Sequence, residues 1–200
     1  MTDGRKQHSK RGLETKRRIL NAGFKLFSQK GLHGTNSREI AAVAGVSIGS
    51  FYTYYKNKRI LFIDLMQRHC TRVMDALAAV PAKENLDKDP RQVVHTMIRV
   101  IWNLHDSVYP LNQKALSLRE IDPEIDQIIE EQERAIIQRL VSILKTAESR
   151  LRIRDMETAA WLLERIILEV MHQVSRSKAK DKNDRIVNEL MDMISRYLIK

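Results

Sequence analysis

Apolar residues recur every three or four positions along most of the chain, which is the period of a helix with one buried face. Between residues 15 and 30 the period is carried by Ile19, Ala22 and Leu26, and Gly31 is suited to end the helix. No segment shows the convincing alternation of a half-buried strand. The pattern therefore predicts an all-α protein of about nine helices.

Capping residues divide the next segment into two short helices. Asn36 is followed three residues later by Glu39, which is the spacing of a capping box and predicts a helix start. Gly45 can end this helix, because glycine adopts a positive φ at little cost. Ser47 can then cap another short helix, which we expect to run to about Tyr55. The spacing thus predicts two helices joined by a tight turn.

Longer helices are predicted for the rest of the chain. Asn57 can cap the first of them, and we expect Pro110 to interrupt the second, because proline has no N–H to donate inside a helix. Asp122 and Asp155 are suited to start two later helices. The apolar stripes of the expected helices cover 61–77, 93–104, 111–118, 125–151, 159–174 and 186–198.

The net charge is concentrated at the start of the chain. The first 58 residues hold twelve Lys and Arg against three Asp and Glu, whereas the whole chain has a net charge of +10. Residues 1–14 also lack a hydrophobic period, so we interpret them as a basic disordered arm. A cationic first part on a nearly neutral remainder is typical of a module that binds nucleic-acid phosphates.

Residues 38–55 have the features of a helix-turn-helix. Ala41 is small enough for two helices to approach closely, and Gly45 allows the turn between them. Val46 and Phe51 are placed to pack the second helix onto the first. The outward side of this second helix is expected to present Ile48, Ser50, Thr53 and Tyr54. Such a helix fits the major groove of DNA and can read base edges.

Residues 16–61 resemble the DNA-binding domain of the TetR family of bacterial transcription regulators. The resemblance rests on Ile19-Leu20, Ala22, Leu26-Phe27, Gly31, Thr35, Ile40-Ala41, Ala44-Gly45-Val46-Ser47, Gly49, Tyr52, Tyr55 and Lys58. It implies an N-terminal three-helix helix-turn-helix DNA-binding domain over residues 15–60. It also implies a larger C-terminal helical domain for effector binding and dimerisation over residues 61–200, which fits that part in length and helix content.

The resemblance further implies which residues contact double-stranded DNA. Phosphate contacts are implied for Ser37, Tyr52 and Lys58, and groove contacts for Arg38, Ile48, Gly49, Ser50, Thr53 and Tyr54. Ser37, Ile48 and the pair Tyr54-Tyr55 depart from the residues most frequent in the family. The operator sequence therefore does not follow from the family pattern.

The body of the chain is expected to bind a small effector molecule. The residues that the family fold would gather around a cavity are Met66, Met97, Trp102, His105, Tyr109, Leu116, Arg119 and Trp161. Two tryptophans, a tyrosine and adaptable methionines favour a hydrophobic or aromatic ligand. The alternative interpretation is that these residues are plain core, and for any single one of them it is the better one.

The last two predicted helices are apolar over wide faces, so we expect them to form a homodimer interface. The residues concerned are Ile166, Ile167, Val170, Met171, Val174, Leu190, Met193, Ile194 and Tyr197. Pairing with the same helices of a second copy would form a twofold four-helix bundle. Such a dimer would place its two recognition helices on a pseudo-palindromic DNA site.

These patterns bear on three possible functions. The main hypothesis is a DNA-binding transcriptional regulator, expected to be a repressor, that a small ligand releases from its operator. The alternative keeps the DNA-binding dimer but assigns the body to a protein partner, with no small-molecule effector. The third is an enzyme, but no HExxH motif, Gly-rich phosphate loop or nucleophile elbow occurs. We therefore expect no enzymatic activity.

Cysteine, histidine and hydropathy limit the remaining possibilities. Cys70 is the single cysteine, which excludes an internal disulfide framework and a Cys-based zinc cluster. No two of the six His have metal-ligand spacing, so we expect no metal and no cofactor. No apolar stretch approaches the roughly 20 residues that span a bilayer. We expect a cytoplasmic protein without a membrane partner.

Overall fold

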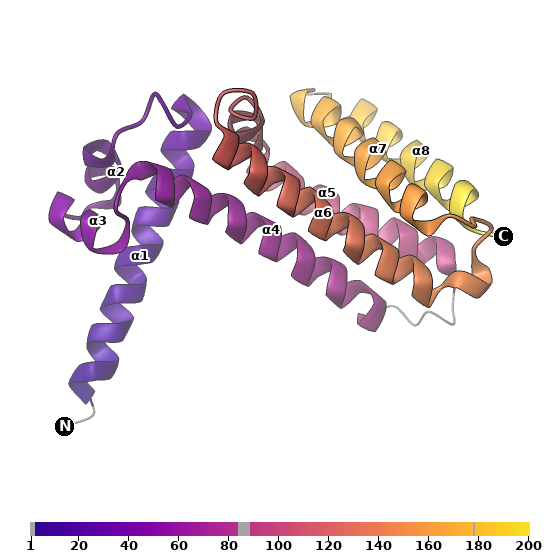
Figure 1. Ribbon diagram of the computed structural model, residues 1–200, viewed down its shortest axis with the longest axis horizontal. Coiled ribbons are helices and arrows are strands. Elements are labelled where there is room, and N and C mark those ends of the chain that lie inside the picture. Colours follow the sequence, from indigo (N-terminus) through magenta and orange to yellow (C-terminus); the bar gives the residue numbers. More distant parts are fainter. Residues whose placement is uncertain (1–2, 84–88, 178) are drawn as a thin grey trace. The chain divides into compact units, whose positions relative to one another are not determined.

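The computed structural model describes residues 3–83, 89–177 and 179–200, and most of these residues are helical (Figure 1). In chain order the elements are α1 (Asp3–Lys30), α2 (Ser37–Ala44), α3 (Ile48–Tyr54), α4 (Lys58–Lys83), α5 (Pro90–Leu116), α6 (Pro123–Thr146), the short 3-10 helix η1 (Glu148–Arg150), α7 (Met156–Arg176) and α8 (Lys180–Leu198). Over the described ranges there is no strand, and an isolated bridge joins Leu151 to Ile199. The prediction of an all-α fold is confirmed.

The chain forms two compact units. The first takes its described residues from the first 69 positions and from Pro110–Ile125, and the second is formed by Cys70–Tyr109 and Asp126–Lys200. Helices α4, α5 and α6 therefore each contribute residues to both units. The first unit extends beyond the expected range 15–60 and includes a segment from the middle of the chain. The functions assigned to the ranges 15–60 and 61–200 stay predictions.

Helix α1 begins twelve residues before the helix start expected at Thr15. The expectation of a disordered arm over residues 1–14 is therefore corrected at residues 3–14, while Met1 and Thr2 lie outside the described residues. The physical reason is that extending an existing helix adds one hydrogen bond per ordered residue, without a new nucleation step. Arg, Lys, Gln and Glu in this segment are also good helix formers.

Pro110 does not interrupt the helix as expected. It lies inside α5, which runs without a break from Pro90 to Leu116. The neighbouring side chains of Val108, Tyr109 and Leu111 are all buried. Their packing offsets the loss of the one backbone N–H that proline lacks, so residues 111–116 of the predicted separate helix 111–118 form the end of α5.

In the first unit α2 packs against α1, α3 packs against α2, and α4 contacts α1. Phe27 of α1 and Phe62 of α4 are both fully buried, and their rings meet edge to face with centroids 5.2 Å apart. Gly23 allows α4 to lie close to α1, because a Cβ there would be 2.7 Å from Leu61 Cδ2. These contacts hold α4 against α1, the helix on which α2 also packs.

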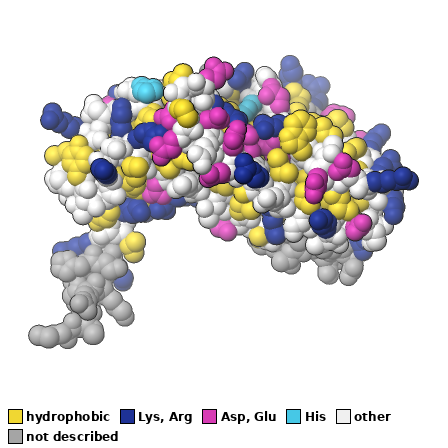
Figure 2. Space-filling view, viewed as in Figure 1, with side chains coloured by type: hydrophobic (Ala, Val, Ile, Leu, Met, Phe, Trp, Pro, Cys, Tyr) yellow, Lys and Arg dark blue, Asp and Glu magenta, His cyan; other side chains and the backbone are white. Residues whose placement is uncertain are grey.

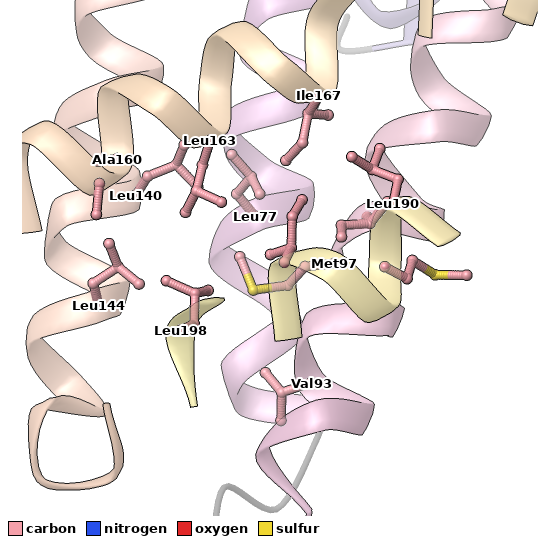
Figure 3. Close-up of a cluster of buried hydrophobic side chains, with 14 of the residues drawn as sticks. Leu77, Val93, Met97, Leu140, Leu144, Ala160, Leu163, Ile167, Leu190 and Leu198 are labelled. Carbon is pink, nitrogen blue, oxygen red and sulfur yellow. The ribbon is translucent and has the colours of Figure 1, made fainter. Parts of the chain in front are cut away.

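The second unit has an aliphatic core. Figure 3 shows Leu144 of α6, Leu163 of α7 and Leu198 of α8 directed toward the same interior region, and all three are buried. Helices α7 and α8 lie side by side and run antiparallel (Figure 1). The end of the chain is tied to the connection between α6 and α7, because the Arg152 amide donates to the Leu198 carbonyl at 2.9 Å.

Candidate nucleic-acid interface and effector cavity

The helix-turn-helix forms through the predicted caps. Asn36 Oδ1 accepts a hydrogen bond of 2.9 Å from the Glu39 amide at the start of α2. Gly45 ends α2 with a φ of 63°. Ser47 Oγ accepts a hydrogen bond of 3.0 Å from the Ser50 amide at the start of α3. All three local predictions are confirmed. The three capping residues form the turn between α2 and α3.

Helix α1 supports the helix-turn-helix from behind. Arg18 Nη1 donates a hydrogen bond of 3.2 Å to the Gly45 carbonyl in the turn. Lys30 of α1 pairs with the carboxylate of Glu39 on α2. The α1–α2 connection is held by Thr35, whose buried hydroxyl donates to the Gly31 carbonyl at 2.8 Å. The turn and α2 are thus fixed to α1 before any partner binds.

The orientation of α3 follows from two buried aromatic residues. Phe51 and Tyr55 are almost completely buried, so the opposite side of the helix faces solvent. That side exposes Ile48 by 38% and Tyr52 by 55%, and Thr53 is exposed with them. The Tyr52 ring packs edge to face on Phe51, with the two ring centroids 5.5 Å apart.

Two predicted groove residues are less exposed than expected. Tyr54 is half-buried, and a Cβ added at Gly12 would lie 3.3 Å from its hydroxyl oxygen. Its hydroxyl lies beside the part of α1 that the sequence pattern did not predict, and its expected contact with DNA stays a prediction. Ser50 is also half-buried, with its Oγ 2.9 Å from Ser47 Oγ.

Gly49 is a glycine that the protein itself does not require. Its φ is not positive, because among the described glycines Gly31 and Gly45 have that conformation. A Cβ at position 49 would meet Ser47 Oγ at 3.8 Å, which is ordinary van der Waals contact. Glycine nevertheless costs about 1 kcal/mol relative to alanine in a helix. A bare backbone on the exposed side of α3 is what close approach by an outside partner needs.

The remaining predicted DNA contacts surround α2 and the start of α4. Ser37 is half-buried at the first turn of α2, and Arg38 is exposed beside it. Lys58 Nζ donates to the Thr35 carbonyl at 2.6 Å and more weakly to the His33 carbonyl at 3.4 Å. An ammonium group has three donors, so one stays available for a phosphate. The sequence pattern predicted the phosphate contact of Lys58 but not its hydrogen bonds to the α1–α2 connection.

The second unit contains a cavity of about 350 Å³. Its aliphatic lining comes from α5, α6, α7 and α8, and Ile98, Leu140, Leu163 and Ile194 are buried members of it. The polar lining residues, Thr146, Ser149 and Arg150, come from the end of α6 and from η1. A volume of this size lies within the range of small-ligand sites. The cavity is therefore the candidate effector site.

The eight predicted pocket residues do not gather around this cavity. Met97 lines it, whereas Trp161 is 49% exposed on α7. Met66, Leu116 and Arg119 belong to the first unit. Trp102 is half-buried against the core cluster of the second unit. The resemblance indicated helices but not the rotation of each helix, so it did not identify the aliphatic lining.

His105 and Tyr109 meet in a different place. Their rings lie with His172 of α7 in one aromatic group, with the two histidine centroids 5.0 Å apart. Burial lowers the pKa of His172 and favours its neutral form. Arg176 Nε donates a hydrogen bond of 3.1 Å to the Tyr109 hydroxyl. This packing joins α5 to α7 inside the second unit, outside the cavity lining.

The predicted interface residues divide into two groups. Five of them are buried in this chain's own core and are therefore not exposed for contact with a second copy: Ile167, Met171, Val174, Leu190 and Ile194. Ile166, Met193 and Tyr197 are exposed, and Val170 is half-exposed. In Figure 2, hydrophobic side chains reach the surface over α7 between charged ones. Helices α7 and α8 each have two apolar faces. Sequence periodicity alone did not show which of the two faces packs into the core.

Among the residues that the structure describes, no three His, Cys, Asp or Glu side chains are arranged to hold a metal ion. Of the described helices, none combines the length and the apolar character that crossing a membrane requires.

The fold and the capped turn define a helix-turn-helix protein with a helical body. Residues 19–65 match the model of bacterial regulatory proteins of the tetR family, and residues 89–198 match that of the tetracyclin repressor-like C-terminal domain. The chain therefore belongs to the TetR family of bacterial regulatory proteins. The resemblance found in the sequence is confirmed.

Individual relatives agree with this assignment. The chain is 41% identical over 54 residues to the HTH-type transcriptional regulator AcrR of Shigella flexneri, a match covering 27% of this chain and 25% of that protein. It is 34% identical over 82 residues to YerO of Bacillus subtilis, covering 38% and 28%. The chain thus matches less than a third of the length of these curated relatives.

Solved structures extend the similarity to the whole fold. The fatty acid degradation regulator FadR from Bacillus halodurans superposes with a TM-score of 0.75 at 20% identity, covering 90% of this chain and 94% of that one. SmeT in complex with triclosan superposes with a TM-score of 0.72 at 22% identity, covering 93% and 92%. At such identities the likeness establishes the fold.

Proposed function

We propose that this protein is a sequence-specific DNA-binding transcriptional regulator, acting as a repressor, with α3 as its recognition helix. The observation that carries the proposal is the exposed side of α3, where Ile48 and Tyr52 flank the glycine at position 49. Ile48 can contact a thymine methyl group, and the Tyr52 hydroxyl can donate to a phosphate. Exposed Arg38 and Lys56 add positive charge next to this surface.

The operator is proposed to be pseudo-palindromic and to be bound by a homodimer. A single α3 reads only a few base pairs, so a second copy is needed for a specific site. Exposed apolar side chains on α7 and α8, namely Ile166, Met193 and Tyr197, support dimerisation through these helices. Since the proposed partner is chromosomal DNA, the proposed place of action is the cytoplasm.

The regulation is proposed to depend on a small apolar effector in the second unit. The cavity of about 350 Å³ supports this choice over a body that only recruits a protein partner. Release from DNA requires that the effector bind the DNA-free conformation more tightly than the DNA-bound one. By reciprocity, operator DNA must then weaken effector binding by the same factor.

The test is selection of duplexes from a random library by the purified full chain, followed by fluorescence anisotropy. We expect a single enriched palindromic motif and an affinity that falls steeply between about 50 and 200 mM salt, because released counterions drive phosphate binding. Absence of binding to any duplex at about 50 mM salt would refute the proposal.

A further inference from the structure

The cavity of the second unit has a chemistry that selects among apolar ligands. Every residue in its deep part is aliphatic or methionine, and no aromatic ring lines it within the described residues. Ile98, Leu144 and Leu163 form part of this wall, and each is less than 10% exposed. A wall of this kind offers no ring to stack on and no hydrogen bond, so it suits a flexible aliphatic chain.

The polar lining is confined to one end. Thr146 is the last residue of α6, and Ser149 and Arg150 belong to η1 in the stretch that joins α6 to α7. Thr146 and Ser149 are exposed, so this end of the cavity reaches the surface. The Thr146 hydroxyl is already engaged, since it donates to the Ile143 carbonyl at 2.7 Å.

The charge at this end is positive. Arg150 is the charged residue among the described residues of the lining, and its planar guanidinium suits a carboxylate. Lys200 also lies here, with its Nζ donating to the Ser149 carbonyl at 2.8 Å. Lys145 and Arg152 are exposed nearby, whereas the acidic residues here are Glu148 of η1 and the exposed Asp89, which precedes the lining residue Pro90. The balance of these groups attracts an anion.

We infer that this cavity binds an unbranched alkyl carboxylate, with the chain among α5, α6, α7 and α8 and the carboxylate at Arg150. The inference names the effector class within the regulatory function proposed above, and it rests on that function for its biological consequence. A cavity of about 350 Å³ holds about a dozen groups of water's size, each taking about 30 Å³. A methylene group is of comparable size, so the best ligand has about twelve carbons.

The experiment is isothermal titration calorimetry of the full chain with n-alkanoates of increasing length. Each alkanoate is kept below its critical micelle concentration. Affinity is expected to rise about fourfold per added methylene until the cavity is full, and then to level off. The n-alkanol of equal length, which lacks the charge, is expected to bind at least about tenfold more weakly. Equal affinities for dodecanoate and dodecanol would overturn the assignment of the carboxylate to Arg150.

Two pairs of variants locate the site. Val94→Phe fills the cavity from a half-buried position, while Val100→Phe adds the same ring on the same helix outside the lining. Arg150→Gln removes the cation of the lining, and Arg152→Gln removes an exposed neighbour. We expect the first member of each pair to lose at least about tenfold in dodecanoate affinity. Unchanged affinity in Val94→Phe, with helicity intact by circular dichroism, would overturn the site.

Operator binding separates this inference from the proposed function. If dodecanoate binds through Val94 and Arg150 and lowers operator affinity, both stand. If it binds there but leaves operator affinity unchanged, the ligand class stands and its role as effector is refuted. If dodecanoate does not bind while the protein recognises an operator, the inference fails and the proposed regulator remains.

Discussion

The Tyr55 hydroxyl donates a hydrogen bond of 2.6 Å to the carboxylate of Asp64, joining the end of α3 to α4. Asp64 also accepts from Arg68 Nε at 2.8 Å and lies 3.8 Å from Lys16 Nζ of α1. The Lys16 ammonium sits 5.6 Å from the centre of the Tyr55 ring. Three helices of the first unit thus meet at one partly buried polar group, next to the proposed recognition surface.

The first prediction removes the bond between Tyr55 and Asp64. Tyr55→Phe keeps the buried ring and should destabilise the protein by about 1–2 kcal/mol, because a hydrogen bond to a charged group is lost. Arg68 still satisfies Asp64, which keeps the loss at the lower end. Urea denaturation measures it, and Tyr52→Phe is the control, since Tyr52 is exposed. Equal losses in both variants would contradict the assigned role.

The same hydroxyl should give a pH dependence. Burial, reinforced by the bond to Asp64, raises the pKa of Tyr55 above its ordinary value. A group whose pKa is raised by folding contributes stability below the unfolded value and loses it as pH increases. The wild-type protein should therefore lose stability as pH rises above about 10. In Tyr55→Phe this component should be missing, and denaturation at a series of alkaline pH values would detect the difference.

Arg59 and Asp122 provide a second test within the first unit. Arg59 donates to Asp122 through Nη2 at 2.7 Å and Nε at 3.3 Å, and also pairs with Glu124. Asp122→Asn keeps an oxygen to accept from the Ile125 amide but loses the ion pair. We expect a loss of about 1 kcal/mol at neutral pH. Glu124→Gln, at an exposed position, should cost less.

The effect of Asp122→Asn should depend on pH with a definite sign. The hydrogen bond from Arg59 lowers the pKa of Asp122. A lowered pKa means that the stabilisation is present above the unfolded value of about 3.9 and is lost as pH falls. The stability difference between wild type and variant should therefore shrink below about pH 4. A difference that persists at about pH 2 would show that charge is not its source.

Dimerisation through α7 and α8 is tested with charges at exposed positions. Ile166→Glu combined with Met193→Glu should yield monomers in sedimentation, because each unpaired charge buried at an interface costs about 3–5 kcal/mol. Operator affinity should fall as the dimer is lost. Ile121→Glu is the matched control, since Ile121 is 67% exposed in the first unit. A double variant that still sediments as a dimer would mean that other surfaces form the interface.

Local signals in the sequence predicted the helix-turn-helix well, but they did not predict side-chain rotation. Asn36, Gly45 and Ser47 act through bonds within three or four residues, so their roles could be inferred from spacing. The Tyr54 hydroxyl lies close to Gly12, 42 positions earlier, in a segment with no hydrophobic period. No pattern along the chain encodes such a contact.

The candidate effector site shows the same limit at larger scale. Trp161 and Met97 both fitted a pocket by composition, yet Trp161 is exposed and Met97 lines the cavity. Ile167 fitted a dimer surface and is buried in the core. These outcomes depend on which side of each helix faces the others, and a helix with two apolar sides leaves that choice to tertiary packing.

Gly49 gives the prediction in which stability and function should change in opposite directions. Gly49→Ala places a Cβ where the protein has room, since the nearest atom would be Ser47 Oγ at 3.8 Å. Stability should rise by about 0.5–1 kcal/mol, because alanine is the better helix former. Operator affinity should fall by about 1–3 kcal/mol, the usual cost of forcing an extra group into a close-packed contact.

Thermal unfolding and anisotropy on the selected operator measure the two effects on the same preparation. Ser50→Ala is a useful comparison, because its half-buried hydroxyl faces Ser47 rather than solvent. It should change operator affinity less than Gly49→Ala does. If Gly49→Ala stabilised the protein and bound the operator as tightly as wild type, the DNA would not approach α3 at this position. The recognition surface would then have to be sought on another side of the first unit.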